Sequence, residues 1–162
     1  MDYPLSKTDI ERYFNGKIKI VLYHEISNYK TIDELLAPYG RICILYYWKK
    51  YSGHWVCVFR NKNKRVEIFD SFGTFIDGTL KDINQEFRNA TNQSYKHLTA
   101  LLFKNGQPVE YNDKKLQSIK SSTCGRWCIY RMKRKDLTIE EFQNLFKHIK
   151  NKDNKIISLT NI

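Results

Sequence analysis

Gln-Ser-Ile-Lys-Ser-Ser-Thr-Cys-Gly-Arg-Trp-Cys, residues 117–128, is the stretch around which the rest of the chain is organised. A polar segment leads into Cys124, Gly125 follows at once, and the sequence then becomes apolar and compatible with a helix. This order predicts Cys124 at a helix N-terminus, where unpaired N–H groups and the positive end of the helix dipole favour a thiolate. Gly125 has no Cβ, so a substrate is able to approach the backbone closely. Cys124 is therefore a candidate nucleophile.

Composition and charge set the broad class of the protein. Its 162 residues fit one domain, residues 1–162, with a core that needs neither disulfides nor metal. The 28 Lys and Arg against 17 Asp and Glu give a formal net charge of +11, spread along the chain. Such a surface attracts polyanions, with nucleic acid first, although a lysine-rich composition is as typical of an ordinary solvated surface.

The cysteines and the hydropathy pattern lead to expectations about the compartment. Cys43, Cys57, Cys124 and Cys128 lack the spacing of a secreted disulfide scaffold, which favours free thiols in a reducing environment. The chain has no run of 18 apolar residues and no basic segment followed by an apolar core. We therefore expect a soluble protein that is not secreted and has no membrane partner.

Helices are expected where apolar residues recur at helical spacing behind a capping signal. Thr8 with Glu11, Thr31 with Glu34, and Thr138 with Glu141 fit capping boxes. The expected helices span residues 6–14, a short segment from 31 that stops before Pro38, residues 79–89, 124–133 and 138–150.

Strands are expected at residues 17–23, 42–48, 54–59, 65–69 and 97–103. The segment 42–48 is apolar at every position, which is typical of a central strand covered on both faces. The segments 54–59 and 65–69, joined by a short basic loop, fit an antiparallel hairpin. Residues 104–123 are expected to form a loop. The predicted fold class is α+β, a central and mostly antiparallel sheet with helices in one layer pair.

A base and its orienting acid follow from this hairpin. His54 opens one strand in Gly53-His54-Trp55, and Asp70 closes the next. Because the start of one antiparallel strand lies beside the end of its partner, the two side chains are expected to be neighbours. A carboxylate beside an imidazole fixes its tautomer and stabilises the imidazolium, which allows the histidine to take a proton from a thiol.

A glutamine completes the candidate site. Gln117 lies seven residues before Cys124, and its amide is a neutral donor that would join the Cys124 N–H in binding an oxyanion. Gln107 is an alternative, but it precedes Pro108 and lies further from the nucleophile. The predicted catalytic residues are His54, Asp70, Gln117 and Cys124, and the predicted chemistry is acyl transfer through a thioester.

Several other residues have a simpler interpretation. The remaining histidines, His24, His97 and His148, lack a comparable carboxylate and are expected to be structural or exposed. Cys128 follows Cys124 by one helical turn, but this pair without two more ligands is a weak zinc signal, so we expect Cys128 in the core. The basic residues after the nucleophile are expected to form a solvated helix face, with a polyanion-binding stripe as the alternative. They are Arg126, Arg131, Lys133, Arg134 and Lys135.

The sequence resembles the adenain-like cysteine proteases over residues 42–132. The resemblance lies in the order His, Asp, Gln, Cys and in the motifs Gly-His-Trp, Phe-Asp-Ser-Phe-Gly and Gln-x6-Cys-Gly. This superfamily includes the adenovirus maturation protease and the SUMO-specific proteases. The resemblance implies a triad of His54, Asp70 and Cys124, with Gln117 in the oxyanion hole. It also implies substrate binding at Trp55, which walls the site, and at Gly125. Asp70 matches the SUMO proteases, whereas the adenoviral type has glutamate.

The length and composition are most similar to virus-encoded capsid-maturation proteases, including those of virophages and Polinton-type elements. The resemblance therefore implies a cysteine endopeptidase that cleaves viral structural precursors after small residues such as Gly, in the virion and in the cytoplasm or nucleus of the host. DNA is a possible partner through the basic surface, and no cofactor or metal is expected. The alternatives are an isopeptidase for SUMO- or ubiquitin-like modifiers and a basic nucleic-acid-binding module.

Overall fold

A computed structural model describes residues 2–50, 52–104 and 106–162, and it is α+β. Met1 of the predicted domain, Tyr51 beside the predicted hairpin and Asn105 of the predicted loop 104–123 lie outside the described residues. The sheet has the strand order β1-β2-β3-β4-β5. The strands are β1 (Lys19–Leu22), β2 (Arg41–Lys49), β3 (Ser52–Arg60), β4 (Val66–Phe69) and β5 (Val109–Tyr111).

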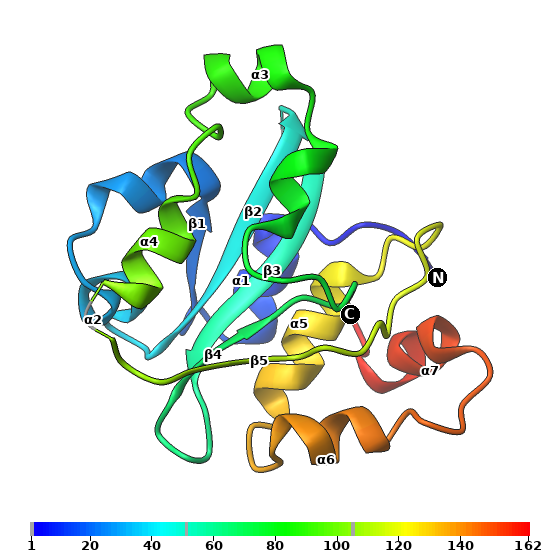
Figure 1. Ribbon diagram of the computed structural model, residues 1–162. Helices are drawn as coiled ribbons and strands as arrows, with labels where there is room; N and C mark the ends of the chain where they lie inside the picture. The colour runs from blue at the N-terminus through cyan, green and yellow to red at the C-terminus, as the bar shows by residue number, and fades with distance from the viewer. Residues whose placement is uncertain (1, 51, 105) are drawn as a thin grey trace.

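Helices connect and flank these strands (Figure 1). The α-helices are α1 (Lys7–Tyr13), α2 (Ile32–Leu36), α3 (Gln85–Ala90), α4 (His97–Phe103), α5 (Cys124–Lys133), α6 (Ile139–Asn144) and α7 (Lys152–Leu159). The 3₁₀ helices are η1 (Tyr23–Asn28) and η2 (Gly78–Asp82).

The sheet is mixed, so the prediction of a mostly antiparallel sheet is wrong. β2 pairs with β3 and β3 with β4 in antiparallel fashion, whereas β1–β2 and β4–β5 are parallel. The parallel pairs arise because helices occupy both connections: η1 and α2 separate β1 from β2, and η2, α3 and α4 separate β4 from β5. A helical crossover returns the chain to the end from which it started, which parallel pairing requires.

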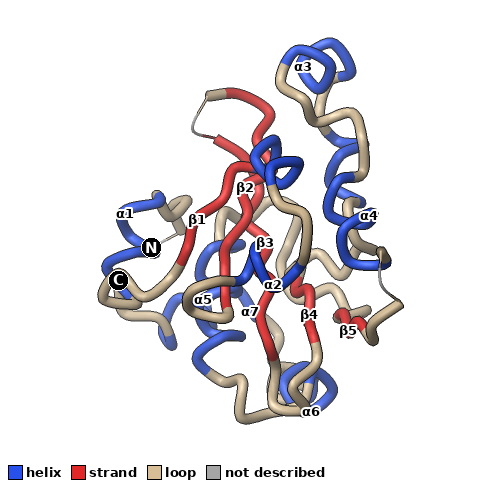
Figure 2. Tube along the Cα trace, turned by 90° about the vertical axis from the view of Figure 1, so that its left-hand side faces the viewer, coloured by secondary structure: helices blue, strands red, loops and turns tan. Residues whose placement is uncertain are grey.

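Helices cover both faces of the sheet, which corrects the expected single layer pair. One core cluster joins the sheet to α1, α5, α6 and α7, and the other joins it to η1, α2, η2 and α4. The two sides separate in Figure 2, where α4 and α1 lie on opposite sides of the strands. β2 contributes Cys43 and Leu45 to the first cluster and Ile42, Ile44 and Tyr46 to the second, which confirms it as a central strand.

Two helices begin at the predicted capping signals. α2 follows Thr31, whose side chain accepts from the Glu34 N–H, and α6 begins with the capping box of Thr138 and Glu141. α5 spans the predicted residues. The cap of α1 is Ser6 with Asp9 rather than Thr8 with Glu11, because Ser6 and Asp9 exchange both side-chain-to-backbone hydrogen bonds. Polar pairs that fit the pattern occur at both positions, and the helix begins at the earlier one.

The structure overturns several other boundaries. Residues 97–103 form helix α4 rather than a strand, and the buried residues Leu98, Leu101 and Leu102 lie at helical spacing. The predicted helix 79–89 is divided into η2 and α3, because Ile83 is extended. The predicted helix 138–150 ends as α6 at Asn144, and helix α7 follows. The predicted loop 104–123 contains β5.

The β3–β4 hairpin creates the place where the candidate site forms. β4 ends at Phe69, opposite Cys57, while β3 continues back to Ser52. The edge of β3 before Cys57 therefore has no β4 partner, and α5 packs against this part of β3.

Candidate active site

His54 and Asp70 meet as the hairpin predicts. His54 Nε2 lies 2.8 Å from Asp70 Oδ1, and the two residues are only 2% and 6% exposed. Cys124, the first residue of α5, is close enough to His54 to contribute to the raised pKa of the imidazole. The imidazole thus lies between a carboxylate and a thiol, which is the arrangement needed to move a proton from the sulfur.

The open edge of β3 holds the sulfur of Cys124. The Trp55 N–H has no β4 residue to pair with, and it donates to Cys124 Sγ at 3.4 Å. The helix start and this strand edge therefore fix the sulfur from two directions.

A network that the sequence did not predict holds Asp70 in place. Besides His54, Asp70 Oδ1 accepts from the Phe72 N–H at 2.9 Å, and Oδ2 accepts from Thr74 Oγ1 at 2.8 Å. Asn112 makes two hydrogen bonds with the backbone of Asp70. Its Oδ1 accepts from the Asp70 N–H at 2.9 Å, and its Nδ2 donates to the Asp70 carbonyl at 2.6 Å. Asn112 is 1% exposed, and its only sequence signal was an Asn-Asp turn pattern.

The electrostatics of the pair favour two charged groups. Burial lowers the pKa of His54, but the hydrogen bonds with Asp70 and Cys124 outweigh it and raise that pKa to about 10. Burial raises the pKa of Asp70, but hydrogen bonds and attraction from His54 prevail and lower it below its ordinary value. The geometry therefore holds an imidazolium beside a carboxylate at neutral pH.

Phe72 fixes the plane of the imidazole. Its ring stacks on that of His54 with centroids 4.5 Å apart and an interplanar angle of 19°. Phe72 belongs to the Asp-Ser-Phe-Gly turn that follows β4, so one short segment supplies both the acid and the stacking ring. Stacking and the Asp70 hydrogen bond together leave the histidine little rotational freedom.

Gln117 is buried, 2% exposed, in the loop that leads to Cys124. Its Oε1 accepts from Ser71 Oγ at 2.5 Å, and its Nε2 donates to the Ser121 carbonyl at 2.8 Å. These two bonds fix which end of the amide is the donor. An amide nitrogen carries two hydrogens, so Gln117 Nε2 has one donor beyond the bond to Ser121. The alternative, Gln107, is partly exposed and lies just before β5.

Trp55 and Gly125 pack against the N-terminal segment of the chain. Trp55 Nε1 donates to the Leu5 carbonyl at 2.9 Å. A Cβ on Gly125 would lie 3.1 Å from Leu5 Cβ and 3.2 Å from Trp55 Cδ1, so the close approach at Gly125 is made by the chain itself. Trp55 also lines a largely apolar cavity of about 530 Å³ with Leu5, Leu22, Leu45 and Gly53.

The remaining histidines lie outside this arrangement. His24 Nδ1 lies 2.5 Å from the Tyr47 hydroxyl, His97 packs between Tyr23 and Tyr95, and His148 is exposed. Within the residues that the structure describes, no group of three or more His, Cys, Asp or Glu is arranged to hold a metal ion.

Cys128 and two of the basic residues after the nucleophile belong to the interior. Cys128 is fully buried and contacts the Trp55 carbonyl, as a core residue does. Arg126 and Arg131 are 2% and 0% exposed, so the expected solvated face is wrong for these two. Arg126 Nη1 donates to the Thr160 carbonyl at 2.6 Å.

The fold and the site define an α+β protein with a buried Cys-His-Asp arrangement at a helix N-terminus. No known family model matches the sequence. The chain is 40% identical over 141 residues to "Uncharacterized protein V9" of the Sputnik virophage, a match that covers 86% of this chain and 81% of that protein. The chain belongs to the family of this virophage protein, which agrees with the expected virus-type and virophage-type origin. Across the described ranges, no helix has both the length and the apolar character to cross a bilayer.

Proposed function

We propose that the protein is a cysteine endopeptidase of the adenain-like type. The observation that carries the proposal is the buried His54–Asp70 pair beside Cys124, whose sulfur accepts a hydrogen bond from the N–H of Trp55, the residue after His54. Its support from sequence is the order His, Asp, Gln, Cys with the motifs around each residue. These residues come from β3, the turn after β4, the loop before α5 and the start of α5.

In the proposed reaction, Cys124 has already given its proton to His54, and the resulting thiolate attacks the carbonyl carbon of a peptide bond. The tetrahedral oxyanion accepts hydrogen bonds from the free Nε2 hydrogen of Gln117 and from the Cys124 N–H, and one such donor is worth on the order of 10²–10³ in rate. The His54 imidazolium then protonates the leaving amine, which leaves a thioester on Cys124. Water, deprotonated by His54, hydrolyses the thioester and restores the thiol.

The proposed substrates are viral structural precursor proteins, cleaved after small residues such as Gly during virion maturation. The virophage relative supports a viral setting, and the similarity to capsid-maturation proteases supports this class of substrate. The work of the enzyme would then take place in the virion or in the infected cell.

The direct test uses Cys124→Ala with Cys128→Ala as the matched control, because both cysteines lie on α5 one helical turn apart. Purified protein is incubated with the capsid protein encoded beside it, and new termini are mapped by mass spectrometry. We expect Cys124→Ala to abolish cleavage while the circular dichroism spectrum is unchanged, and Cys128→Ala to retain cleavage. His54→Ala should be nearly as inactive, and Asp70→Asn less impaired. Turnover by the Cys124→Ala protein would refute the assignment of Cys124 as the nucleophile.

Two rival functions give different outcomes in companion assays. A ubiquitin-fold probe that ends in Gly-Gly would label an isopeptidase and leave a capsid protease mostly unlabelled. A nucleic-acid-binding module would ignore a thiol-directed peptide probe and keep its function in Cys124→Ala. Labelling of Cys124 by a peptide probe ending in Gly, lost in His54→Ala, would support the endopeptidase over both.

A further inference from the structure

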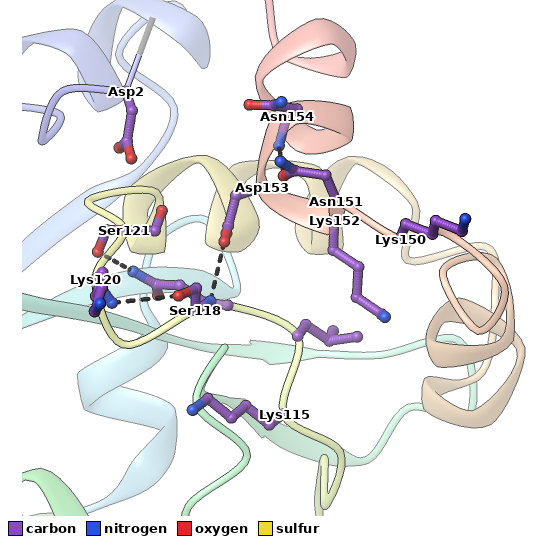
Figure 3. Close-up of a pocket in the computed structure, with 12 residues that line it drawn as sticks. Asp2, Lys115, Ser118, Lys120, Ser121, Lys150, Asn151, Lys152, Asp153 and Asn154 are labelled. Carbon is purple, nitrogen blue, oxygen red and sulfur yellow. Dashed lines mark hydrogen bonds between the residues drawn. The ribbon is translucent and has the colours of Figure 1, made fainter.

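A second cavity lies beside the loop that leads to the nucleophile. It has a volume of about 500 Å³ and is open to solvent between the segment 115–121 and the start of α7. Figure 3 shows Lys115 and Lys120 on the first of these segments and Lys150 and Lys152 at the second. We call it the lysine pocket, after Lys115, Lys120, Lys150 and Lys152.

The positive charge of this pocket is not balanced within the described chain. Lys115, Lys120 and Lys150 are exposed and form no ion pair or side-chain hydrogen bond among the described residues. Lys152 Nζ donates to the Ile149 carbonyl, a neutral acceptor, at 3.1 Å. The four lysines outnumber Asp2 and Asp153, so the lining of the pocket has an excess of two positive charges, which attracts anions.

The two carboxylates that line the pocket are committed to other partners. Asp153 accepts from the Ser118 N–H at 3.0 Å, from Thr123 Oγ1 at 2.6 Å and from Trp127 Nε1 at 3.2 Å. Asp2 accepts from the Ser122 N–H at 2.9 Å. Both acids therefore serve to fold the loop before Cys124, and neither is paired with a lysine of the pocket.

This chemistry places an anion site next to the candidate catalytic residues. Gln117 and Ser118 line the pocket, and Asp153 bonds to Thr123, the residue just before Cys124. The pocket and the candidate site therefore share one loop, residues 117–123, so a polypeptide bound at Cys124 lies beside a wall of the pocket.

The surroundings favour a polypeptide over a nucleic acid. None of the described residues that line the pocket is aromatic, whereas sites for single-stranded nucleic acid stack bases on aromatic side chains. Ile119, between the pocket residues Ser118 and Lys120, is 75% exposed. An apolar side chain beside several lysines matches a peptide that carries both apolar and acidic residues.

We propose that the lysine pocket binds acidic side chains of the polypeptide substrate, in a segment that flanks the bond to be cleaved. The inference rests on the proposed endopeptidase function for the identity of the ligand. The binding itself depends only on the pocket, so it is measured apart from catalysis.

The test measures binding on the Cys124→Ala background, in which the proposed reaction is blocked. The probe is a fluorescein-labelled decapeptide of alternating Glu and Gly, and its neutral partner has Gln in place of Glu. We expect the acidic peptide to bind at low salt and the neutral one to bind far more weakly. Lys120→Glu/Lys150→Glu should weaken binding of the acidic peptide at least tenfold, and Lys120→Gln/Lys150→Gln by a smaller factor.

The matched control is Lys81→Glu/Lys96→Glu, which makes the same charge change at two exposed lysines of the elements on the other face of the sheet. It should change binding less than twofold. An equal loss in the control and the pocket variant would overturn the proposal, as would equal affinity for both peptides. Tighter binding of a ten-nucleotide oligothymidylate that is lost only in the pocket variant would assign the pocket to nucleic acid instead. These binding measurements do not depend on catalysis, so a negative cleavage assay would not change their interpretation.

Discussion

His54 is the residue whose charge state matters most for the proposed reaction. Its pKa is raised to about 10 because Asp70 and Cys124 both favour the imidazolium. We predict that the His54 Cε1–H resonance titrates with a midpoint near that value, measured by NMR. Asp70→Asn removes the carboxylate and should lower the midpoint. A wild-type midpoint near the ordinary value of about 6.5 would contradict the charged pair.

The same pair makes stability depend on pH. A histidine with a raised folded-state pKa contributes stability that is fully present below about 6.5 and is lost as pH rises through the folded value. Asp70, with a lowered pKa, contributes stability that is lost as pH falls through that pKa. The unfolding free energy of the wild type relative to His54→Gln should therefore decline from neutral pH towards pH 10, as measured by urea unfolding.

Asn112 should matter for the same site without touching the histidine. Asn112→Ala leaves the buried N–H and carbonyl of Asp70 without their partner. Each unsatisfied buried group costs about 1–3 kcal/mol, so with two such groups we predict a loss of roughly 2–6 kcal/mol in unfolding free energy. The control Asn63→Ala changes an exposed turn side chain and should be nearly neutral. A small effect of Asn112→Ala on both stability and the His54 titration would rule out this positioning role.

Sequence alone predicted the meeting of His54 with Asp70 but not the support from Asn112. The first depends on one local rule, that neighbouring ends of an antiparallel hairpin are close. The second depends on β5, a short strand that pairs in parallel with β4 after a long helical crossover. Nothing local in the sequence indicates such a pairing, so the sequence did not predict that Asn112 binds the backbone of Asp70.

At the scale of elements, the turn after β4 carries both the acid and Phe72, and Gly73 allows it to form. Gly73 has φ +70°, and a Cβ there would lie 2.7 Å from the Lys114 carbonyl carbon. Gly16 has φ +77° with nothing within 4 Å of its Cβ position. Both Gly→Ala changes incur the left-handed penalty of about 1–2 kcal/mol, but Gly73→Ala adds a backbone clash.

We therefore predict that Gly73→Ala destabilises the protein by at least about 2 kcal/mol more than Gly16→Ala, in urea unfolding. Because Asp70 lies in the same turn, Gly73→Ala should also lower the His54 midpoint, whereas Gly16→Ala should not. Equal losses in the two variants would mean that the turn moves freely away from Lys114.

Element types were predictable where the pattern was long and its boundaries were marked. α5 begins and ends as expected, because a polar loop and a cysteine–glycine step precede an apolar run. α4 was taken for a strand, since a short apolar run of seven residues fits a buried strand as well as a helix. Packing on η1 and the second core cluster decides in favour of the helix.

At the scale of the whole molecule, one buried ion pair fastens the nucleophile helix to the sheet. Arg131 of α5 forms a bidentate pair with Glu67 of β4 at 2.8 and 2.9 Å, with both side chains fully buried. Arg131 also donates to the carbonyls of Arg134 and Leu137, which fixes the turn towards α6. The sequence showed only a basic cluster after Cys124; an arginine in a helix is normally exposed, and its partner lies 64 residues away.

Variants of this pair distinguish the stability that the ion pair contributes from the stability lost when one buried charge has no partner. Arg131→Met leaves Glu67 buried without its cation, and Glu67→Leu leaves Arg131 without its anion. Breaking a buried pair by removing one partner costs about 3–5 kcal/mol, whereas replacing both by apolar residues is often neutral. We predict that each single variant loses about 3–5 kcal/mol in urea unfolding, and that Arg131→Met/Glu67→Leu loses less than either one.

The exposed pair of Arg134 with Asp136 is the matched control. Arg134→Met should change the unfolding free energy far less than the variants of the buried pair do. Because α5 carries Cys124 at its other end, a double variant that keeps its stability should also keep the His54 titration. If the losses of the two single variants simply add in the double variant, the two side chains act independently, and the fastening of α5 to β4 must come from the surrounding apolar contacts instead.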